Sequence, residues 1–296
     1  EEAHIRTYIE KDGLENRVDM HLRKNKAKGI AIDGIPIRRS SELLGMVNII
    51  FFSPEDLKIV KNGPSERRRF VNLELSQLDN VYLYDLGEYN KVLHQRNKLL
   101  KQMIYEPSLI DTLDIWDEQL VNYGIRIIKT RTKFLQMLSE IVTKYNSRLT
   151  GGKERVEVFY EPDVSWENFA DKLKQTRKKD LHFCNTGVGP HRDDICFMNG
   201  DIDIRRFGSQ GQQRTCALSL KLAEIELVKK IIGDTPVLLL DDVLSELDRN
   251  RQNFLMESIS DIQTIVTCTG LEEFIDKSLA LDRIFKVTDG TVKIEK

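Results

Sequence analysis

The sequence predicts an α/β protein interrupted by a helical subdomain, and three observations support this prediction. Apolar runs typical of buried strands alternate with helical segments after residue 154. Residues 79–149 contain few glycines and repeat their apolar side chains at alternating spacings of three and four. Residues 3–37 alternate apolar and polar side chains, as antiparallel strands do. We therefore expect a mixed sheet with flanking helices and an inserted helical part.

The composition excludes several classes of protein. The 296 residues are 40% hydrophobic and 31% charged, which is enough for one large domain or two moderate ones. The 45 Lys and Arg balance 47 Asp and Glu, so a histone-like or ribosomal class is disfavoured, although a local basic patch remains possible. No apolar run is long enough to span a bilayer and no secretory signal opens the chain, so we expect a cytoplasmic protein with no membrane partner. The cysteines lack metal-binding spacing and are expected to be free thiols in a reducing cytosol: Cys184, Cys196, Cys216 and Cys268.

The start of the chain is expected to be β-rich before it turns helical. Asp33-Gly34 lies between two short apolar strands and indicates a hairpin. Residues 47–52 form a continuous apolar run suited to a buried strand. The next turn is expected to start a short helix, with Ser53 as its N-cap and Asp56 at the third position. A second helix is expected to begin near Pro64.

The helical segment is expected to contain two long helices that fold back on each other at Pro107. Ser108 and Asp111 have the spacing of a capping box for the second helix. The apolar spacing is typical of a coiled coil, and ordinary core helices of a bundle are the alternative. The repeat positions are Leu86, Tyr89, Leu93, Arg96, Leu100 and Met103 in the shorter helix, and Leu113, Trp116, Leu120, Tyr123, Ile127, Thr130, Phe134, Met137 and Ile141 in the longer one.

The last part of the chain alternates strands and helices, which favours a parallel sheet covered on both faces. Two pairs, Asn199-Gly200 and Asp289-Gly290, indicate hairpins. The expected strands are residues 154–160, 193–198, 201–207, 235–242 and 261–267, and the expected helices are residues 166–180, 216–232 and 251–259.

Asp241 and Asp242 directly follow the apolar strand 237–240. Ligands of parallel sheets bind at the carboxyl ends of the strands. There Asp241 could hold Mg²⁺ while Asp242 orients an attacking water. Taken alone, such a pair is more often a strand end capped by a solvated carboxylate, because a carboxylate is costly to bury.

Residues 207–215, FGSQGQQRT, precede an apolar helix and suit an anion. The Ser209 hydroxyl and the unpaired N–H groups of a helix N-terminus can hold a phosphate. Gly208 and Gly211 allow the backbone to approach that phosphate closely. The alternative is that residues 207–215 are a flexible polar loop without a ligand. Taken together, the runs favour a nucleotide site: Ser209 precedes Asp241 by about thirty residues, and Ser245-Glu246-Leu247-Asp248 begins four residues after Asp241.

The runs FFSPEDLKIVKNGPSERRRF, VGPHRDD, GSQGQQRT and LLLDDVLSELD together resemble the RecF family, relatives of the SMC-type chromosome proteins. The resemblance extends from about residue 1 to 296. It implies an ABC-type ATPase head that uses ATP and Mg²⁺. On this basis residues 1–78 are the β-rich N-terminal part of the head with a Q-loop-like turn, 79–180 are a helical arm, and 181–296 are the C-terminal part.

The resemblance also implies the roles of the site residues. Asp241 is the magnesium-associated Walker B residue, and Asp242 takes the position of the catalytic carboxylate. The signature residues meet the γ-phosphate held by another subunit, and the D-loop lies at the same interface. The Q-loop-like turn has no Gln, and His191 and Arg192 belong to the family pattern without a physical role. The signature matches Ser209, Gln210, Gly211 and Gln212, and the D-loop matches Ser245 and Asp248.

The sequence contains no P-loop of the form GxxxxGK[ST], and Gly151-Gly152-Lys153 does not replace it. In the family this motif lies upstream, so we expect the segment before residue 1 to be absent here. ATPase activity is then expected of the complete protein and not of this chain. The alternative is an inactive fragment that serves as a structural or interaction domain. A transporter-type ABC subunit is disfavoured by the missing glutamine and the helical insert.

The resemblance further implies an ATP-dependent DNA-binding clamp for recombinational repair of single-strand gaps. The expected partners are duplex DNA beside such gaps, the RecO and RecR mediators that help load the recombinase, and a second copy in an ATP-dependent homodimer. DNA replication and the SOS response belong to the same expectation. Basic clusters could touch DNA phosphates, or be solvated helix faces: Arg67, Arg68 and Arg69; Arg177, Lys178 and Lys179; and Arg205 with Arg206.

Overall fold

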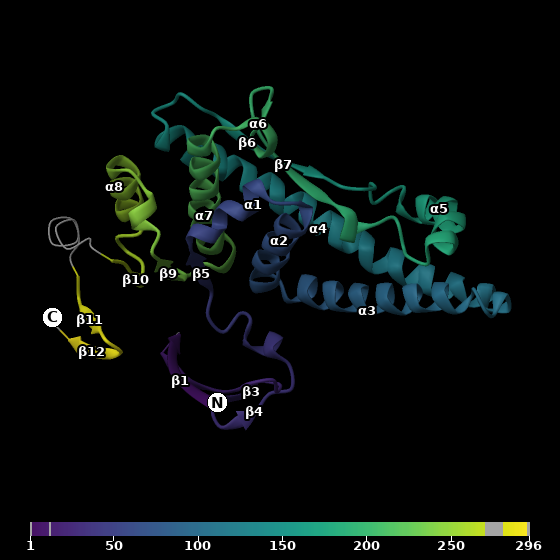
Figure 1. Cartoon of the computed structure of the whole chain (residues 1–296), viewed down its shortest axis with the longest axis horizontal. Helices are drawn as coiled ribbons and strands as arrows, with labels where there is room; N and C mark the ends of the chain where they lie inside the picture. Colours follow the sequence, from purple (N-terminus) through teal and green to yellow (C-terminus); the bar gives the residue numbers. More distant parts are fainter. Residues whose placement is uncertain (1, 12, 270–280, 295–296) are drawn as a thin grey trace.

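The computed structural model consists of a body with a long helical arm and a small separate sheet (Figure 1). Helix α7 (Gln210–Ile232) lies in the body, and α3 (Asn80–Gln102) and α4 (Leu113–Leu149) run side by side to form the arm. The predicted insertion of a helical part between two β-containing parts is therefore confirmed. The structure describes residues 2–11, 13–269 and 281–294.

The N-terminal strands form an antiparallel sheet, as predicted. Its order is β1-β2-β3-β4. Asp33 and Gly34 adopt φ values of 52° and 84°, so this pair turns the β3–β4 hairpin in the left-handed conformation that Asp and Gly tolerate. The strands are β1 (Glu2–Lys11), β2 (Leu14–Arg23), β3 (Gly29–Ile32) and β4 (Ile35–Pro36).

A parallel sheet of order β10-β9-β5 lies beside α7. Ile50, Phe52, Leu238 and Leu240 point to one face and form a core with α7 and α8. The expected cover on both faces is not found in the described part of the chain, because burial alternates along β5. On the other face Ile49, Phe51 and Ile265 are 39%, 47% and 57% exposed. The elements are β5 (Ile49–Phe52), β9 (Val237–Asp241), β10 (Thr264–Thr267) and α8 (Arg249–Ser258).

The turn after β5 forms as predicted. The Ser53 hydroxyl accepts a hydrogen bond from the Glu55 N–H at 3.2 Å, and the Asp56 carboxylate accepts one from the Ser53 N–H at 2.8 Å. This capping box starts the short η2 helix (Pro54–Asp56), which continues into α1 (Leu57–Lys61). Helix α2 (Pro64–Leu78) begins at the predicted proline.

The third sheet is antiparallel, of order β6-β7-β8, and β6 lies against α4. The predicted strand 201–207 is wrong beyond Asp203, since residues Ile204–Phe207 form helix α6. The Asp203 carboxylate accepts a hydrogen bond from the Arg205 N–H at 3.0 Å and caps that helix. The predicted hairpin at Asp289-Gly290 is confirmed. The strands are β6 (Val156–Glu161), β7 (Asp194–Asn199), β8 (Ile202–Asp203), β11 (Phe285–Thr288) and β12 (Thr291–Ile294).

The two arm helices fold back on each other as predicted, but two details differ. The capping box at Ser108 does not form: residues Pro107–Thr112 make the 3-10 helix η3, and α4 starts only at Leu113. The buried stripe of α4 is also shifted by one residue at every second repeat position. Where Trp116, Tyr123, Thr130 and Met137 were expected, the structure buries Asp117, Gly124, Arg131 and Leu138.

Buried ion pairs account for two of these four positions, Asp117 and Arg131. Arg96 is fully buried on α3 and donates to the Asp117 carboxylate at 2.6 Å and to the Asp180 carboxylate at 2.8 Å. It also donates to the Thr186 hydroxyl at 2.8 Å. These bonds join α3, α4 and α5 (Phe169–Phe183) at the far half of the arm. A buried charge is tolerated only when it is paired in this way, and paired charges are not visible as an apolar stripe.

Candidate functional site

The signature-like residues form the first turn of α7. The Ser209 hydroxyl accepts from the Gln212 N–H at 3.2 Å, and the Gln212 side-chain oxygen accepts from the Ser209 N–H at 2.9 Å. Ser209, Gln210 and Gly211 are exposed. The first turn of a helix has N–H groups without intrahelical acceptors, so this end of α7 suits an anion.

The two glycines of this stretch have different structural reasons. A Cβ at Gly208 would lie 2.7 Å from the Ile204 side chain and carbonyl oxygen, so Gly208 is required by its packing on α6. A Cβ at Gly211 would meet only the Ser209 hydroxyl, at 3.9 Å. Gly211 therefore leaves open space above the helix end, as close approach of a ligand requires.

Asp241 and Asp242 are exposed at the carboxyl end of β9. The Thr267 hydroxyl donates to the Asp241 carboxylate at 2.6 Å, so the last residue of β10 orients this side chain. Asp242 has φ of 52°, and its N–H donates to the Thr267 carbonyl at 3.0 Å. This left-handed conformation is uncommon outside glycine, although Asp and Asn adopt it more readily than most residues.

The D-loop-like residues follow directly. The Ser245 hydroxyl donates to the Asp242 carbonyl at 2.8 Å. Asp248 is the N-cap of α8: it accepts from the Arg251 N–H at 3.0 Å, and this backbone bond is the main cause that lowers the pKa of Asp248. Arg251 also pairs with Asp248 and donates to the Thr215 hydroxyl of α7 at 2.6 Å. Arg251, which the sequence did not reveal, thus connects the D-loop-like turn to the signature helix.

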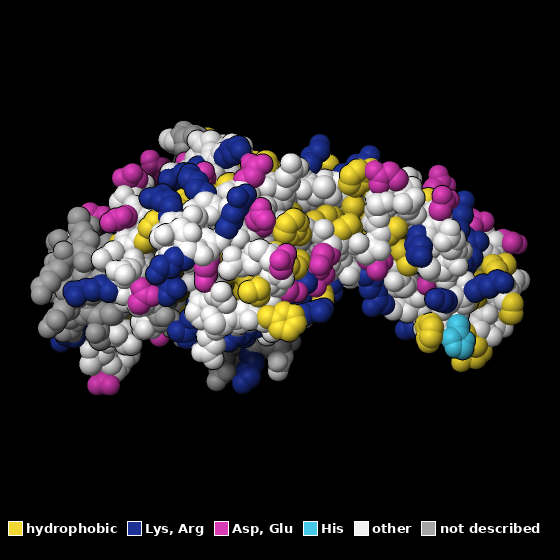
Figure 2. Space-filling model, turned by 90° about the horizontal axis from the view of Figure 1, so that it is seen from above, with side chains coloured by type: hydrophobic (Ala, Val, Ile, Leu, Met, Phe, Trp, Pro, Cys, Tyr) yellow, Lys and Arg dark blue, Asp and Glu magenta, His cyan; other side chains and the backbone are white. Residues whose placement is uncertain are grey.

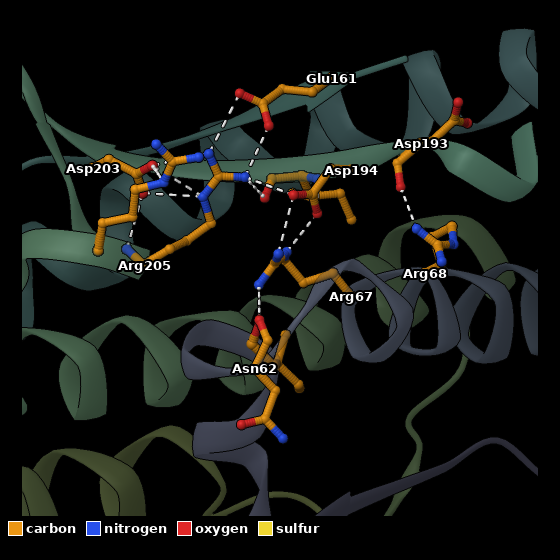
Figure 3. Close-up of polar contacts among 11 residues, drawn as sticks. Asn62, Arg67, Arg68, Glu161, Asp193, Asp194, Asp203 and Arg205 are labelled. Carbon is orange, nitrogen blue, oxygen red and sulfur yellow. Dashed lines mark hydrogen bonds and ion pairs between the residues drawn. The ribbon is translucent and has the colours of Figure 1, made fainter. Parts of the chain in front are cut away.

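The run VGPHRDD has a clear structural role (Figure 3). The Asp194 carboxylate accepts from Arg67 of α2 at 2.6 and 3.0 Å and from Arg205 of α6 at 2.9 Å. Arg205 also donates to Glu161 of β6 at 2.8 Å. Since α6 leads directly into the signature turn, this set of ion pairs fixes the point from which Ser209 projects.

The neighbouring Asp193 carboxylate anchors the same run in the core. It accepts from Arg131 of α4 at 2.7 Å, from the Asp163 N–H at 3.0 Å and from the Tyr160 hydroxyl. The preceding Gly189 has φ of 131°, and a Cβ there would lie 2.6 Å from the Tyr89 hydroxyl. A side chain at this position would therefore clash, which explains the glycine.

His191 fills the space between this run and α3. Its Nε2 lies 3.0 Å from the Thr186 carbonyl and its Nδ1 lies 2.7 Å from the Tyr89 hydroxyl. Burial lowers the pKa of His191, so the ring is neutral, Nε2 donates to the carbonyl and Nδ1 accepts from Tyr89. The role that the sequence left unassigned is thus that of a buried hydrogen-bonded spacer.

The lowered pKa of His191 predicts a dependence of stability on pH. The unfolded chain takes up this proton near the ordinary pKa of about 6.5, whereas the folded chain resists it, so the free energy of unfolding falls as the pH drops below that value. Urea unfolding measures the free energy of unfolding at pH 8 and pH 5.5. This free energy is expected to fall more between the two pH values in the unaltered protein than in the His191→Gln variant. The variant at the exposed His94, His94→Gln, serves as the control and is expected to lose as much as the unaltered protein. Equal losses in all three proteins would contradict the prediction.

A second buried cluster joins α7 to the turn after β5. Lys221 of α7 donates to the Glu224 carboxylate at 2.5 Å and lies 5.8 Å from the centre of the Phe52 ring. Burial, and then the neighbouring Glu74, raise the pKa of Glu224, and burial raises that of Asp56. The charge of Lys221 acts on three largely buried carboxyl groups, Asp56, Glu74 and Glu224, and opposes the effect of burial on the pKa of each. The cluster connects the Q-loop-like turn to the signature helix.

The predicted basic clusters do not all reach the surface. Arg67, only 4% exposed, is held by Asp194, and Arg177 is tied to Asp114 and Asp117 of α4. Neither matches the expectation of a free phosphate contact, because each guanidinium already neutralises a carboxylate. Arg205 is likewise paired, with Glu161, Asp194 and Asp203. On the face seen in Figure 2, basic and acidic side chains alternate. The half-exposed members of the predicted clusters are Arg68, Arg177 and Arg205, and the exposed members are Arg69, Lys178, Lys179 and Arg206.

Three further features concern possible metal ligands, the cysteines and the apolar length of the helices. Within the described ranges no cluster of three or more His, Cys, Asp or Glu side chains could hold a metal ion. Cys184, Cys196, Cys216 and Cys268 are free, and two of them are buried. None of the helices in the described residues is long and apolar enough to cross a bilayer.

The arrangement defines the class of protein as an α/β head of the ABC-type ATPase fold with an inserted helical arm. An Smc head domain with an extended coiled coil from Pyrococcus furiosus shares this fold, with a TM-score of 0.52 over 99% of this chain and 76% of that one, at 16% identity. No family model matches the chain. Comparison with the sequences of individual proteins is more specific.

Relatives from three bacteria, each named DNA replication and repair protein RecF, match nearly the whole chain and 81% of their own length. The Lachnospira eligens protein is 61% identical over 294 residues, the Lachnoclostridium phytofermentans protein 58% and a Clostridium botulinum protein 46%. A solved structure of the recombination mediator protein RecF with ATP, in the RecFOR pathway, is 35% identical and has a TM-score of 0.90 over 99% of this chain and 80% of that one. The chain therefore belongs to the RecF family.

Proposed function

We propose that this chain is the signature-bearing part of an ATP-gated DNA clamp that acts in recombinational repair of single-strand gaps. The observation that supports this best is the exposed first turn of α7, where Ser209, Gln210 and Gly211 surround open space and Gln212 closes the cap. Two heads would sandwich ATP, and Ser209 of each would meet the γ-phosphate held by the other.

The two aspartates at the end of β9 have different proposed roles. Asp241, oriented by the Thr267 hydroxyl, would serve the Mg²⁺ that accompanies ATP. Asp242, whose backbone turns at the end of the strand with φ of 52°, would orient the attacking water. The Ser245 hydroxyl and the Asp248 cap would shape the adjoining loop at the same interface between heads.

The proposed partners follow from family membership. They are duplex DNA beside a single-strand gap, the RecO and RecR mediators, and a second copy of the chain in the ATP-bound dimer. Residues 79–180 would form an arm that shapes the DNA-binding cleft or docks a partner, between head parts 1–78 and 181–296. A cytoplasmic location and a place in the SOS response complete the proposal.

A second candidate is a structural or interaction role without ATPase activity. Light scattering and equilibrium binding of ATP decide between the two. The full-length protein is expected to double its mass with ATP and Mg²⁺, whereas residues 1–296 alone are expected to bind ATP no better than a control protein. A full-length protein that stays monomeric with saturating ATP would contradict the clamp.

A further inference from the structure

We propose that the cavity between α2, α3 and the Pro190–Arg192 turn binds one nucleotide of a DNA strand, with its phosphate held by Arg68 and Arg69. This inference rests on the proposed function and names the place where the strand is held. The cavity has a volume of about 510 Å³ and is open to solvent. That volume is within the range of small-ligand sites and exceeds what a phosphate alone would fill.

The lining of this cavity carries positive charge and no carboxylate. It includes Arg68, Arg69 and Arg131 but no Asp or Glu. Arg131 is buried and already neutralised by Asp193 at 2.7 Å. Arg68 donates to the neutral backbone carbonyl of Asp193 at 2.7 Å (Figure 3), and among the described residues neither Arg68 nor Arg69 forms an ion pair.

A partly buried cation is costly, and the nearby Asp193 and Asp194 offset that cost for Arg68 only in part. Burial, followed by the nearby Arg131, lowers the pKa of Arg68. An anionic ligand would remove the cost, because it would supply the missing charge. Two guanidinium groups lining one cavity match the several oxygens of a phosphate better than the two oxygens of one carboxylate.

The neighbouring polar groups are donors as well. The Asn72 side-chain oxygen already accepts from the Tyr82 hydroxyl at 2.7 Å and from Arg131 at 2.8 Å. These bonds fix the orientation of the amide, so its NH₂ group is directed away from them and is available to a ligand oxygen. His191 is neutral and adds neither charge nor repulsion for an anion.

The remaining wall of the cavity is apolar. Leu73 is 53% exposed, and Leu83 and Leu86 lie beside it in the lining. A phosphate alone would leave these leucines in water, whereas a sugar and base attached to the phosphate would cover them. The combination of two arginines, an amide and a leucine wall therefore favours a nucleotide unit of a polymer. An acidic peptide with apolar residues is the competing ligand.

The test measures how binding of fluorescein-labelled dT20 to the full-length protein, with ATP and Mg²⁺, depends on salt. Each phosphate contact to a single strand contributes about 0.7 to the slope of log K against log salt, so Arg69→Gln is expected to lower the slope by about 0.7 and the Arg68→Gln/Arg69→Gln pair by about 1.4. Arg155→Gln removes the same charge from a side chain that is 74% exposed outside this cavity, and is expected to bind as the unaltered protein does.

Each outcome has a defined meaning. Unchanged slopes in both variants, with urea unfolding showing intact folds, would overturn the proposal while leaving a DNA clamp possible. Failure of the unaltered protein to bind dT20, with binding of a gapped duplex intact, would overturn this site alone, whereas failure to bind the gapped duplex as well would overturn the proposed function. Loss of binding to a labelled peptide of alternating Glu and Leu, with dT20 binding unchanged, would assign the cavity to an acidic partner instead. Competition by dTMP at lower concentration than inorganic phosphate would support the nucleoside contact, and equal competition would overturn it.

Discussion

The full-length protein with Ser209→Arg is expected to remain a monomer at saturating ATP and Mg²⁺. Ser209 is exposed at the first turn of α7, and its small hydroxyl leaves room above Gly211 for a phosphate carried by another head. An arginine side chain would fill that room and would remove the cap on the Gln212 N–H. Light scattering of the ATP-bound protein measures the change as the loss of the doubled mass.

Loss of folding must be separated from loss of the interface. Removal of an N-cap costs about 1 kcal/mol, which a folded head tolerates, and urea unfolding measures it. Ser209→Thr keeps both the hydroxyl and the cap and is expected to dimerise. Ser209→Asp keeps the cap but sets a negative charge against the phosphate, and is expected to stay monomeric. Dimerisation of the Ser209→Arg and Ser209→Asp variants at the same ATP concentration as the unaltered protein would refute the ATP sandwich.

Asp242→Asn is expected to keep ATP binding and to slow turnover of the full-length protein by roughly 10²–10⁴-fold, the usual contribution of a residue that handles the proton of an attacking group. Asn has the same size as Asp and tolerates the left-handed conformation found here, at φ of 52°. The backbone turn and the bond to the Thr267 carbonyl are therefore expected to survive. Steady-state release of phosphate and binding of a fluorescent ATP analogue measure the two effects separately.

The chain offers a matched control for this substitution. Asp289 adopts nearly the same conformation, with φ of 49°, in the exposed β11–β12 hairpin. Asp289→Asn makes the same chemical change in the same backbone geometry, and is expected to leave turnover as it was. If Asp242→Asn hydrolyses ATP as fast as Asp289→Asn, Asp242 has no catalytic role.

Much of the fold was predictable because its rules are local. The hairpins at Asp33-Gly34 and Asp289-Gly290, the capped turn at Ser53 and the proline start of α2 depend on neighbouring residues only. The motif residues at Ser209 and Asp241 were also found in this way, since a helix start and a strand end are visible as changes in local pattern. Their proposed roles in hydrolysis remain predictions.

The errors arose where residues distant in the sequence determine which side chains are buried. Every second repeat position of α4 was misplaced by one residue, at two of these positions because Asp117 and Arg131 are buried by charged partners elsewhere in the chain. The uncovered face of the parallel sheet was missed because residues 49–52, IIFF, are apolar at every position, whereas the structure buries only every second one. Apolar content alone does not reveal which face of a strand another element covers.

By itself, then, the sequence determined the order of the elements, their local starts and turns, and the residues at which nucleotide chemistry is expected. Only the tertiary structure decided which charges are free to act. Arg67 and Arg68 are adjacent on α2, yet Asp194 neutralises the first and the second faces the cavity without a carboxylate. The physical reason is that a buried charge is neutralised by the opposite charge that folding brings within hydrogen-bond distance. For Arg67 that partner is Asp194, which lies 127 residues away in the sequence.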